Sequence, residues 1–506
     1  MSTSGKILSG TVWSTICTIL GAAYSFFATP ILIGYFGNAN YGLVSLATSL
    51  NVCVGLADIG MNTTNVRFLS IWIQEQNWRK VNELFKTSLA IYGMMGILNV
   101  LVLSVVLVYT KDVFNVSDAQ NVTLRHLLWI VIICSILNWY FSCIEQVIRA
   151  TENVGWFQKI AILPKLFLIL VLISTLLFKF DIETFMALTM SVGFITIPLQ
   201  VRKIRREIPD ISFWPQFNQK IFREILPYSV NMFSFAIFQF IYFNMRPVFL
   251  GMRGEIESVT DYRILDGIVN VVGLLPGLFF GVLLPTASRV VKSGNQEALE
   301  RIAYDGTKYL SIFLSFVVFG IMTIGHDLLM IYVGEDFEHL TVWLYLWLFL
   351  IMGNHTNFIS SLMLSQPNLR PLMYNTAFSS LLGLLSCWLL IPYFQVGGTI
   401  MSFMIYSMSQ LLFYYNYYWK HLFGLSSRRI LVHSLMPGTV GGAVVFSICI
   451  FVPHTESYLA NIVIFGSLYV LLFLMSLWLI MNKTDWIFVK ELIKKRRKDE
   501  NEMAIN

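Results

Sequence analysis

The sequence predicts an all-α protein that crosses a membrane about fourteen times. Hydrophobic residues make up 56% of the 506 residues and charged residues only 13%, whereas soluble domains carry roughly 25% charged residues. Apolar runs long enough to cross a bilayer as helices recur along the whole chain. A pattern in the first run returns in the seventh. Together these observations predict two six-helix halves followed by two additional helices.

The predicted membrane helices follow one another with short polar connections. They cover residues 10–33, 41–62, 87–109, 127–147, 158–178, 183–201, 227–250, 264–286, 308–331, 341–364, 371–391, 396–416, 432–452 and 460–481. On this basis we expect an N-terminal lobe at 1–206, a C-terminal lobe at 207–420 and two further transmembrane helices at 421–482. Residues 483–506 read as a basic amphipathic tail on the cytoplasmic membrane surface.

An internal repeat supports the division into halves. The pattern Pro-x-x-x-Gly ends the first helix of each half, and flanking aromatic and glycine positions recur with it. The matching positions are Phe26 and Phe243, Pro30 and Pro247, Gly34 and Gly251, Tyr41 and Tyr262, and Gly60 and Gly281. Two related halves are a common plan of transporters.

Basic residues predict the orientation of the chain. With the N-terminus inside, most of the 35 Lys and Arg residues fall in cytoplasmic segments, as the positive-inside rule requires. The basic residues left outside are Lys111, Arg125, Lys179, Arg246, Arg253 and Arg263. Both termini are therefore expected in the cytoplasm. The net charge of +6 is explained by this bias, and no nucleic-acid partner is expected.

A few charged residues lie within or beside the predicted helices, where charges usually face a water-filled cavity. Four of them are basic and are candidates for binding an anionic group such as a diphosphate or an acidic sugar: Arg149, Lys165, Arg246 and Arg263. Three are acidic and are candidates for coupling transport to an ion: Glu145, Asp58 and Asp266. A structural interpretation stands beside each: Glu145 can pair with Arg149, Arg263 with Asp266, and Lys165 can snorkel to the surface.

Amide and aromatic side chains lie deeper in the predicted helices. The candidates for a polar cavity wall are Tyr24, Asn51, Asn138, Gln239, Tyr242 and Asn270. An amide in hydrocarbon is costly unless it has a partner or faces water. Hydrogen bonds between helices would explain any one of them, whereas the set as a whole suits a cleft for sugar hydroxyls.

The chain lacks the motifs of several other functions. No Gly-x-x-x-x-Gly-Lys-Ser/Thr motif is present, so no nucleotide-driven engine is expected. The six cysteines lie in apolar runs without metal-ligand spacing. No catalytic residue, metal site or cofactor is therefore expected.

Three short motifs occur in order along the chain. They are Pro30–Gly34 followed by Tyr41-Gly42, the Leu-Pro-x-x-Ser pattern at Leu284–Ser288, and the hydrophobic-Tyr-x-Gly pattern in Leu329–Gly334. With these motifs the chain resembles the multidrug/oligosaccharidyl-lipid/polysaccharide flippase superfamily. Within this superfamily the chain looks most similar to the polysaccharide branch, which includes the O-antigen flippases of lipopolysaccharide biosynthesis.

The resemblance implies a MATE-like fold and alternating access without catalysis. The implied substrate is an undecaprenyl-diphosphate-linked oligosaccharide, moved from the inner to the outer leaflet of the bacterial cytoplasmic (inner) membrane. A polysaccharide polymerase or chain-length complex is an implied partner besides membrane lipid.

Two other branches remain alternatives, namely peptidoglycan-precursor flippases and cation-coupled multidrug exporters. Many drug exporters carry an acidic residue in the first helix, and residues 10–33 contain none. A membrane polymerase or acyltransferase is a further alternative, although polymerases usually need a large external loop and none here exceeds about 20 residues.

Overall fold

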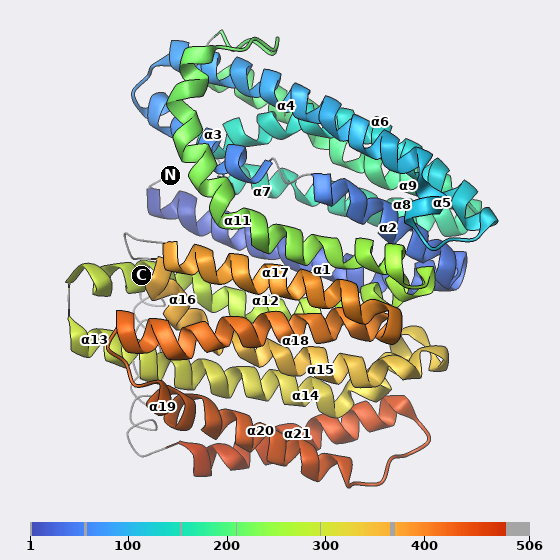
Figure 1. The fold of residues 1–506 in the computed structure, drawn as a ribbon, viewed down its shortest axis with the longest axis vertical. Coiled ribbons are helices and arrows are strands. Elements are labelled where there is room, and N and C mark those ends of the chain that lie inside the picture. Colours follow the sequence, from blue (N-terminus) through green and yellow to red (C-terminus); the bar gives the residue numbers. More distant parts are fainter. Residues whose placement is uncertain are drawn as a thin grey trace, which may run out of the picture. The chain divides into compact units, whose positions relative to one another are not determined.

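The computed structural model describes residues 3–54, 58–151, 154–208, 210–293, 295–364 and 370–481. Almost all of these residues are helical, and no strand occurs among them (Figure 1). Ten helical segments of this part of the chain are long and apolar enough to cross a membrane. Two of the other four predicted runs, 227–250 and 264–286, each lie on one helix. Run 341–364 lies on two α-helices joined by a 3-10 segment, and the described parts of run 41–62 lie on two helices. The all-α membrane fold is thus confirmed, while the predicted tail at 483–506 lies outside the described residues.

Contacts divide the chain into two compact units. Unit 1 comprises Met1–Asn270 with Arg370–Tyr406, and unit 2 comprises Val271–Leu369 with Ser407–Asn506. Unit 1 contains α1 (Thr3–Phe36), α2 (Asn38–Val54), α3 (Asp58–Gln74), α4 (Trp78–Val108), α5 (Thr110–Val113), α6 (Asp118–Ala150), α7 (Val154–Ile160), α8 (Ile162–Phe178), α9 (Ile182–Ser191), the 3-10 turn η2 (Val192–Thr196), α10 (Ile197–Glu207), α11 (Gln219–Arg253) and α17 (Arg370–Phe394).

Unit 2 contains α13 (Gln296–Arg301), α14 (Thr307–Val333), α15 (Thr341–Leu350), α16 (Asn357–Leu364), α19 (Ser427–Arg429), α20 (Met436–Ile450) and α21 (Tyr458–Ile480). Short 3-10 or π-helical segments join these helices: η3 (Ile302–Gly306), η4 (Glu335–Leu340), η5 (Ile351–Thr356), η6 (Tyr414–Leu422) and η7 (Ile430–Leu435). Two helices, α12 (Ile256–Ser293) and α18 (Val396–Phe413), contribute to both units.

Polar side chains define several helix ends in unit 1, because the first N–H groups of a helix lack partners within it. Ser117 and Gln120 form a reciprocal capping box at the start of α6. Asn77 caps α4, and Asp181 caps α9. Hydrogen bonds from the side chain and backbone of Thr184 lower the pKa of the Asp181 carboxyl. These caps place the long helices in a defined register along the chain.

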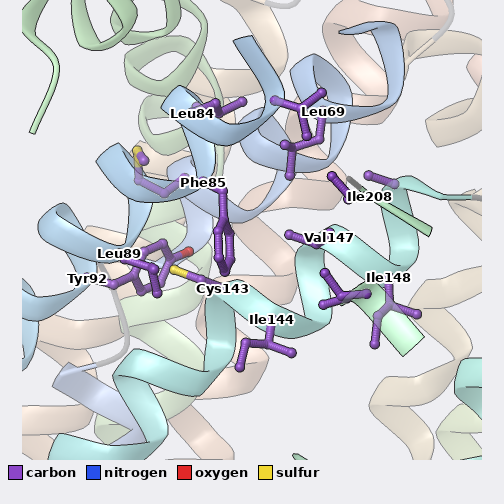
Figure 2. Close-up of a cluster of buried hydrophobic side chains, with 14 of the residues drawn as sticks. Leu69, Leu84, Phe85, Leu89, Tyr92, Cys143, Ile144, Val147, Ile148 and Ile208 are labelled. Atoms are coloured by element: carbon purple, nitrogen blue, oxygen red, sulfur yellow. The ribbon is translucent and has the colours of Figure 1, made fainter. Parts of the chain in front are cut away.

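The core of unit 1 lies where α3, α4 and α6 pack together. Figure 2 shows Phe85, Leu89 and Tyr92 of α4 facing Cys143 and Val147 of α6. Next to this apolar cluster lies a buried polar network. Gln146 donates to the Tyr92 hydroxyl at 2.6 Å and accepts from Asn65 at 2.7 Å, and Ser88 donates to Asn65 at 3.0 Å. Such pairing offsets the cost of burying amides in a membrane protein.

The two repeat copies share a contact between their first helix and the tyrosine that follows it. Thr29, the residue before Pro30, hydrogen-bonds through its hydroxyl to the Tyr41 hydroxyl at 3.2 Å. Arg246, the residue before Pro247, lies with its guanidinium 5.4 Å from the Tyr262 ring centre. Both Thr29 and Arg246 are buried. The sequence repeat therefore corresponds to a repeated side-chain position.

The repeated glycines have different surroundings. A Cβ at Gly251 would lie 2.7 Å from a methyl of Leu46, so α2 and α11 approach closely there. A Cβ at Gly34 would have no heavy atom within 4 Å. Only the second copy of this glycine is thus required by packing.

In unit 2, α14 packs against both α20 and α21 (Figure 1). Asn461 of α21 donates to the Asp327 carboxylate of α14 at 2.9 Å, and both side chains are buried. Asn461 also accepts from the backbone N–H and the hydroxyl of Thr455. This polar contact connects the last two helices, and the loop between them, to the rest of unit 2.

Candidate functional site

Unit 1 contains a cavity of about 330 Å³ with a mixed polar and aromatic wall. This volume is within the range of about 300–1,000 Å³ that is usual for small-molecule sites. Its lining residues are Asn51, Asn138, Trp139, Phe141, Ser142, Glu145, Gly193, Phe194, Ile197, Gln200 and Phe240. The wall thus combines amides, a hydroxyl and a carboxylate with aromatic rings.

Helix α6 supplies one polar side of the cavity. Asn138, Ser142 and Glu145 are spaced four and three residues apart, which places them along one helix face. The adjacent residue, Gln146, points instead into the buried network with Asn65 and Tyr92. One helix therefore presents polar groups both to the cavity and to the protein core.

Gln200 of α10 forms another part of the wall. It follows η2 and the Ile197-Pro198 start of α10, and it is only 3% exposed. Its Nε2 donates to the Thr196 hydroxyl at 3.1 Å. Its Oε1 is buried and accepts no hydrogen bond from the described residues. A buried acceptor without a donor is costly, so Gln200 is a wall residue whose acceptor is not satisfied by the described residues.

Glu145 pairs with Arg149 at the cavity, as the sequence predicts. The two side chains are 3.7 Å apart, and each is about half exposed. The Arg149 guanidinium also lies 5.0 Å from the Phe157 ring centre. Arg149 is not a lining residue of the cavity, whereas Glu145 is.

Arg246 lies in an aromatic cage within unit 1. Its guanidinium is 5.1–5.5 Å from the ring centres of Tyr242, Phe243, Tyr262 and Phe403. The side chain is only 4% exposed. Ring faces attract a cation, and more strongly where water is excluded. The cage therefore stabilises a positive charge in the interior of unit 1.

Arg263 connects α12 to α2. It donates to the Ser49 hydroxyl at 2.7 Å and to the Ser45 carbonyl at 3.5 Å. Its guanidinium is 3.8 Å from the Asp266 carboxylate, which confirms the predicted pair. Arg263 keeps partial access to solvent, with 30% of its side chain exposed. Arg246 and Arg263 thus place two guanidinium groups in one unit.

The remaining candidates that the structure describes are not among the lining residues of the cavity. Lys165 lies against α1, where its Nζ would be 3.5 Å from a Cβ at Gly21. Tyr24 packs on a small apolar cluster of unit 1, and Tyr242 is buried and stacks on Tyr406 with ring centres 4.3 Å apart. Gln239 and Asn270 are exposed. The side chain of Asp58 lies outside the described residues.

The cavity brings together three candidates from the sequence analysis: Asn51, Asn138 and Glu145. Sequence reasoning missed Gln200, Phe194 and Phe240, because they come from helices whose contacts no local pattern reveals. The sequence offered one indication of this part of the cavity, namely Gln200, a polar residue near the end of the predicted helix at 183–201. Among the described residues, no group of three or more His, Cys, Asp or Glu side chains is placed to hold a metal ion.

Comparison with known proteins identifies the family. Residues 7–291 match the model of the family described as "Polysaccharide biosynthesis protein". No curated protein sequence matches the chain.

Solved structures share the fold at low sequence identity. An inward closed lipid II flippase MurJ matches with a TM-score of 0.66 and 14% identity, covering 96% of this chain and 100% of that chain. An inward-facing multidrug resistance MATE family transporter of the MOP superfamily matches with a TM-score of 0.61 and 11% identity, covering 88% of this chain and 100% of that chain. A eukaryotic MATE transporter matches with a TM-score of 0.53 and 13% identity, covering 87% of this chain and 100% of that chain.

The family match spans more than half of the chain, and the fold matches cover most of it. The chain is therefore a multi-pass membrane protein of the polysaccharide biosynthesis family, and it has the fold of transporters of the MOP superfamily.

Proposed function

We propose that the protein is a flippase that carries a lipid-linked oligosaccharide across the membrane by alternating access. The observation that carries this proposal is that unit 1 contains both an amide- and aromatic-lined cavity and two guanidinium groups, those of Arg246 and Arg263. Such a substrate has both a saccharide, which needs hydrogen bonds and apolar faces, and a diphosphate, which needs positive charge. The family match and the fold shared with a lipid II flippase support this substrate class.

In this proposal the basic side chains neutralise the diphosphate. A doubly charged group cannot enter a low-dielectric path unless opposite charge meets it there, and arginine offers a fork of donors that fits phosphate oxygens. Arg263 is the best placed, because it is partly exposed and held at Ser49. Arg246, Lys165 and Arg149 would supply further charge along the path. Glu145, Asp58 or Asp266 would couple transport to an ion.

The resemblance to the polysaccharide branch of the superfamily suggests the identity of the lipid, the saccharide and the membrane. The lipid is undecaprenyl diphosphate, the saccharide is an O-antigen or other surface-polysaccharide repeat unit, and the membrane is the bacterial cytoplasmic membrane with both termini inside. The lobes at 1–206 and 207–420 would move during transport, and a polymerase or chain-length complex would receive the product. Peptidoglycan-precursor transport and cation-coupled drug export are the alternatives of the same superfamily.

Flipping in proteoliposomes tests the proposal. A fluorescent polyprenyl-diphosphate disaccharide should cross the bilayer with the wild-type protein, and about 10–100 times more slowly with Arg263→Ala, which removes charge-assisted hydrogen bonds. Arg263→Lys should recover part of the rate. Arg253→Ala is the matched control, because Arg253 is exposed and lies against Trp388.

A wild-type protein that leaves the disaccharide lipid in place while exporting a lipophilic cation would overturn the proposal and indicate a drug exporter. Equal flipping by Arg263→Ala and the wild type at equal protein content would overturn the role proposed for Arg263 in the pathway.

A further inference from the structure

We propose that the cavity in unit 1 is a subsite for an uncharged, hydroxyl- or acetamido-bearing sugar, and that Glu145 excludes acidic sugars from it. This inference rests on the proposed function, since it names the class of saccharide that the flippase would accept. In this inference the sugar and the diphosphate of the substrate bind at different positions in the protein.

The acceptors in the cavity wall select for a ligand that donates hydrogen bonds. Gln200 lines the cavity, and its buried Oε1 accepts no hydrogen bond from the described residues. The Glu145 carboxylate, when ionised, accepts hydrogen bonds and donates none. Asn51, Asn138 and Ser142 can donate or accept. A sugar hydroxyl or an acetamido N–H would satisfy the acceptors, whereas a phosphate or carboxylate offers no hydrogen to Gln200 or Glu145.

The charge of the wall disfavours an anion. Among the described residues that line the cavity, Glu145 is the charged one, and none is a lysine or an arginine. Its partner Arg149 lies 3.7 Å away against Phe157 and is not part of the lining. A carboxylate in the cavity would meet the Glu145 carboxylate at the wall, whereas the compensating Arg149 lies outside the lining. An acidic sugar and the diphosphate would therefore bind at partly exposed bases outside the lining, such as Arg263.

Aromatic rings complete a surface suited to a sugar ring. Trp139, Phe141, Phe194 and Phe240 line the same cavity as the amides. A pyranose has an apolar face of C–H groups and an edge of hydroxyls, so it needs an apolar surface beside hydrogen-bonding groups. Ligand pockets in general combine an apolar lining with a few placed polar groups. The cavity provides both within a volume of about 330 Å³.

Two lipid probes that differ in a single group test the inference. Both carry the same polyprenyl diphosphate and an N-acetylhexosamine–hexose disaccharide; in one of them the hexose is replaced by the corresponding uronic acid. The wild-type protein should flip the neutral probe about ten times faster. Glu145→Gln should reduce this preference at least about fivefold by admitting the acidic probe. The matched control is Glu224→Gln, because Glu224 is also a half-exposed carboxylate paired with a base, Lys80, but lies outside the cavity.

The contribution of the Gln200 side chain to sugar binding is tested with the neutral probe. Gln200→Met keeps the side-chain length and removes the acceptor, so it should slow flipping of the neutral probe about fivefold. Gln216→Met is the control, since Gln216 is exposed and bonds to Lys86. Thermal unfolding of each purified variant shows whether the protein remains folded.

Binding of the free disaccharides keeps the test independent of transport. Saturation-transfer NMR with the purified protein should detect the neutral disaccharide, and this signal should be lost in Gln200→Met. An unchanged preference in Glu145→Gln, or equal binding of the neutral and acidic disaccharides, would overturn the inference. If the neutral disaccharide binds selectively but neither lipid probe crosses the bilayer, the proposed flippase function fails while the sugar subsite stands.

Discussion

Thr29 and Arg246 occupy the same position in the two copies of the repeat, yet they differ in chemistry. Each precedes the proline of its helix, is buried, and contacts the tyrosine that follows in its own copy. In the first copy the contact is a hydrogen bond between hydroxyls, and in the second it is a guanidinium against an aromatic ring. The repeat thus fixes where a side chain lies, while the residue type decides whether that position carries charge.

The largest effect on stability is expected when Arg246 of the second copy is replaced by threonine, the residue type at the matching position of the first copy. Arg246→Thr removes a guanidinium from among four rings and leaves a void, so it should lower the free energy of unfolding by about 2–4 kcal/mol. Arg246→Lys should lower it less, because the charge is retained. Thermal unfolding of the purified variants in detergent measures both.

The same variants separate the two roles that Arg246 could have. A variant Arg246→Thr that unfolds like the wild type but no longer flips the lipid probe would show that the cage serves the substrate and not stability. The difference between the copies would then be purely functional.

An intermediate effect is expected from alanine at the repeated glycines. Gly251→Ala would bring a Cβ within 2.7 Å of the buried Leu46 and should lower the free energy of unfolding by about 1–3 kcal/mol. Gly34→Ala is the matched control, since its Cβ would meet no heavy atom within 4 Å, and alanine favours a helix over glycine. Equal unfolding temperatures for the two variants would contradict the asymmetry between the copies.

The smallest effect is expected at the hydrogen bond of the first copy. Thr29→Val and Tyr41→Phe should each lower the free energy of unfolding by about 1 kcal/mol. Because they remove the same hydrogen bond, the double variant should cost less than the sum of the two. A double-mutant cycle measures this coupling. Strict additivity would mean that the 3.2 Å contact between the hydroxyls contributes nothing to stability.

Sequence reasoning succeeded where the signal was local. Apolar runs of spanning length predicted the helices, because each is set by a continuous stretch of side chains. The pairs Glu145–Arg149 and Arg263–Asp266 were also predictable, since residues three or four positions apart meet on one helix face. The repeat was visible because proline and glycine recur at fixed spacing.

The cavity could be predicted only in part. Asn51 and Asn138 stood out as amides in apolar runs, but the face of each helix that points inward cannot be read from a run that is apolar on all sides. Tyr242, for example, turns toward Tyr406 and Gly383 rather than into the cavity. Gln200 and Phe240 reach the cavity from α10 and α11, and their proximity depends on tertiary packing.

The contact between Asp327 and Asn461 has a consequence for shortened forms of the protein. Truncation before α21 would remove the amide that donates to a buried carboxylate, and would leave a buried acceptor without that donor, which is costly. The last helix is therefore not a detachable appendage. A shortened form without α21 would need an apolar residue at position 327 to avoid this cost.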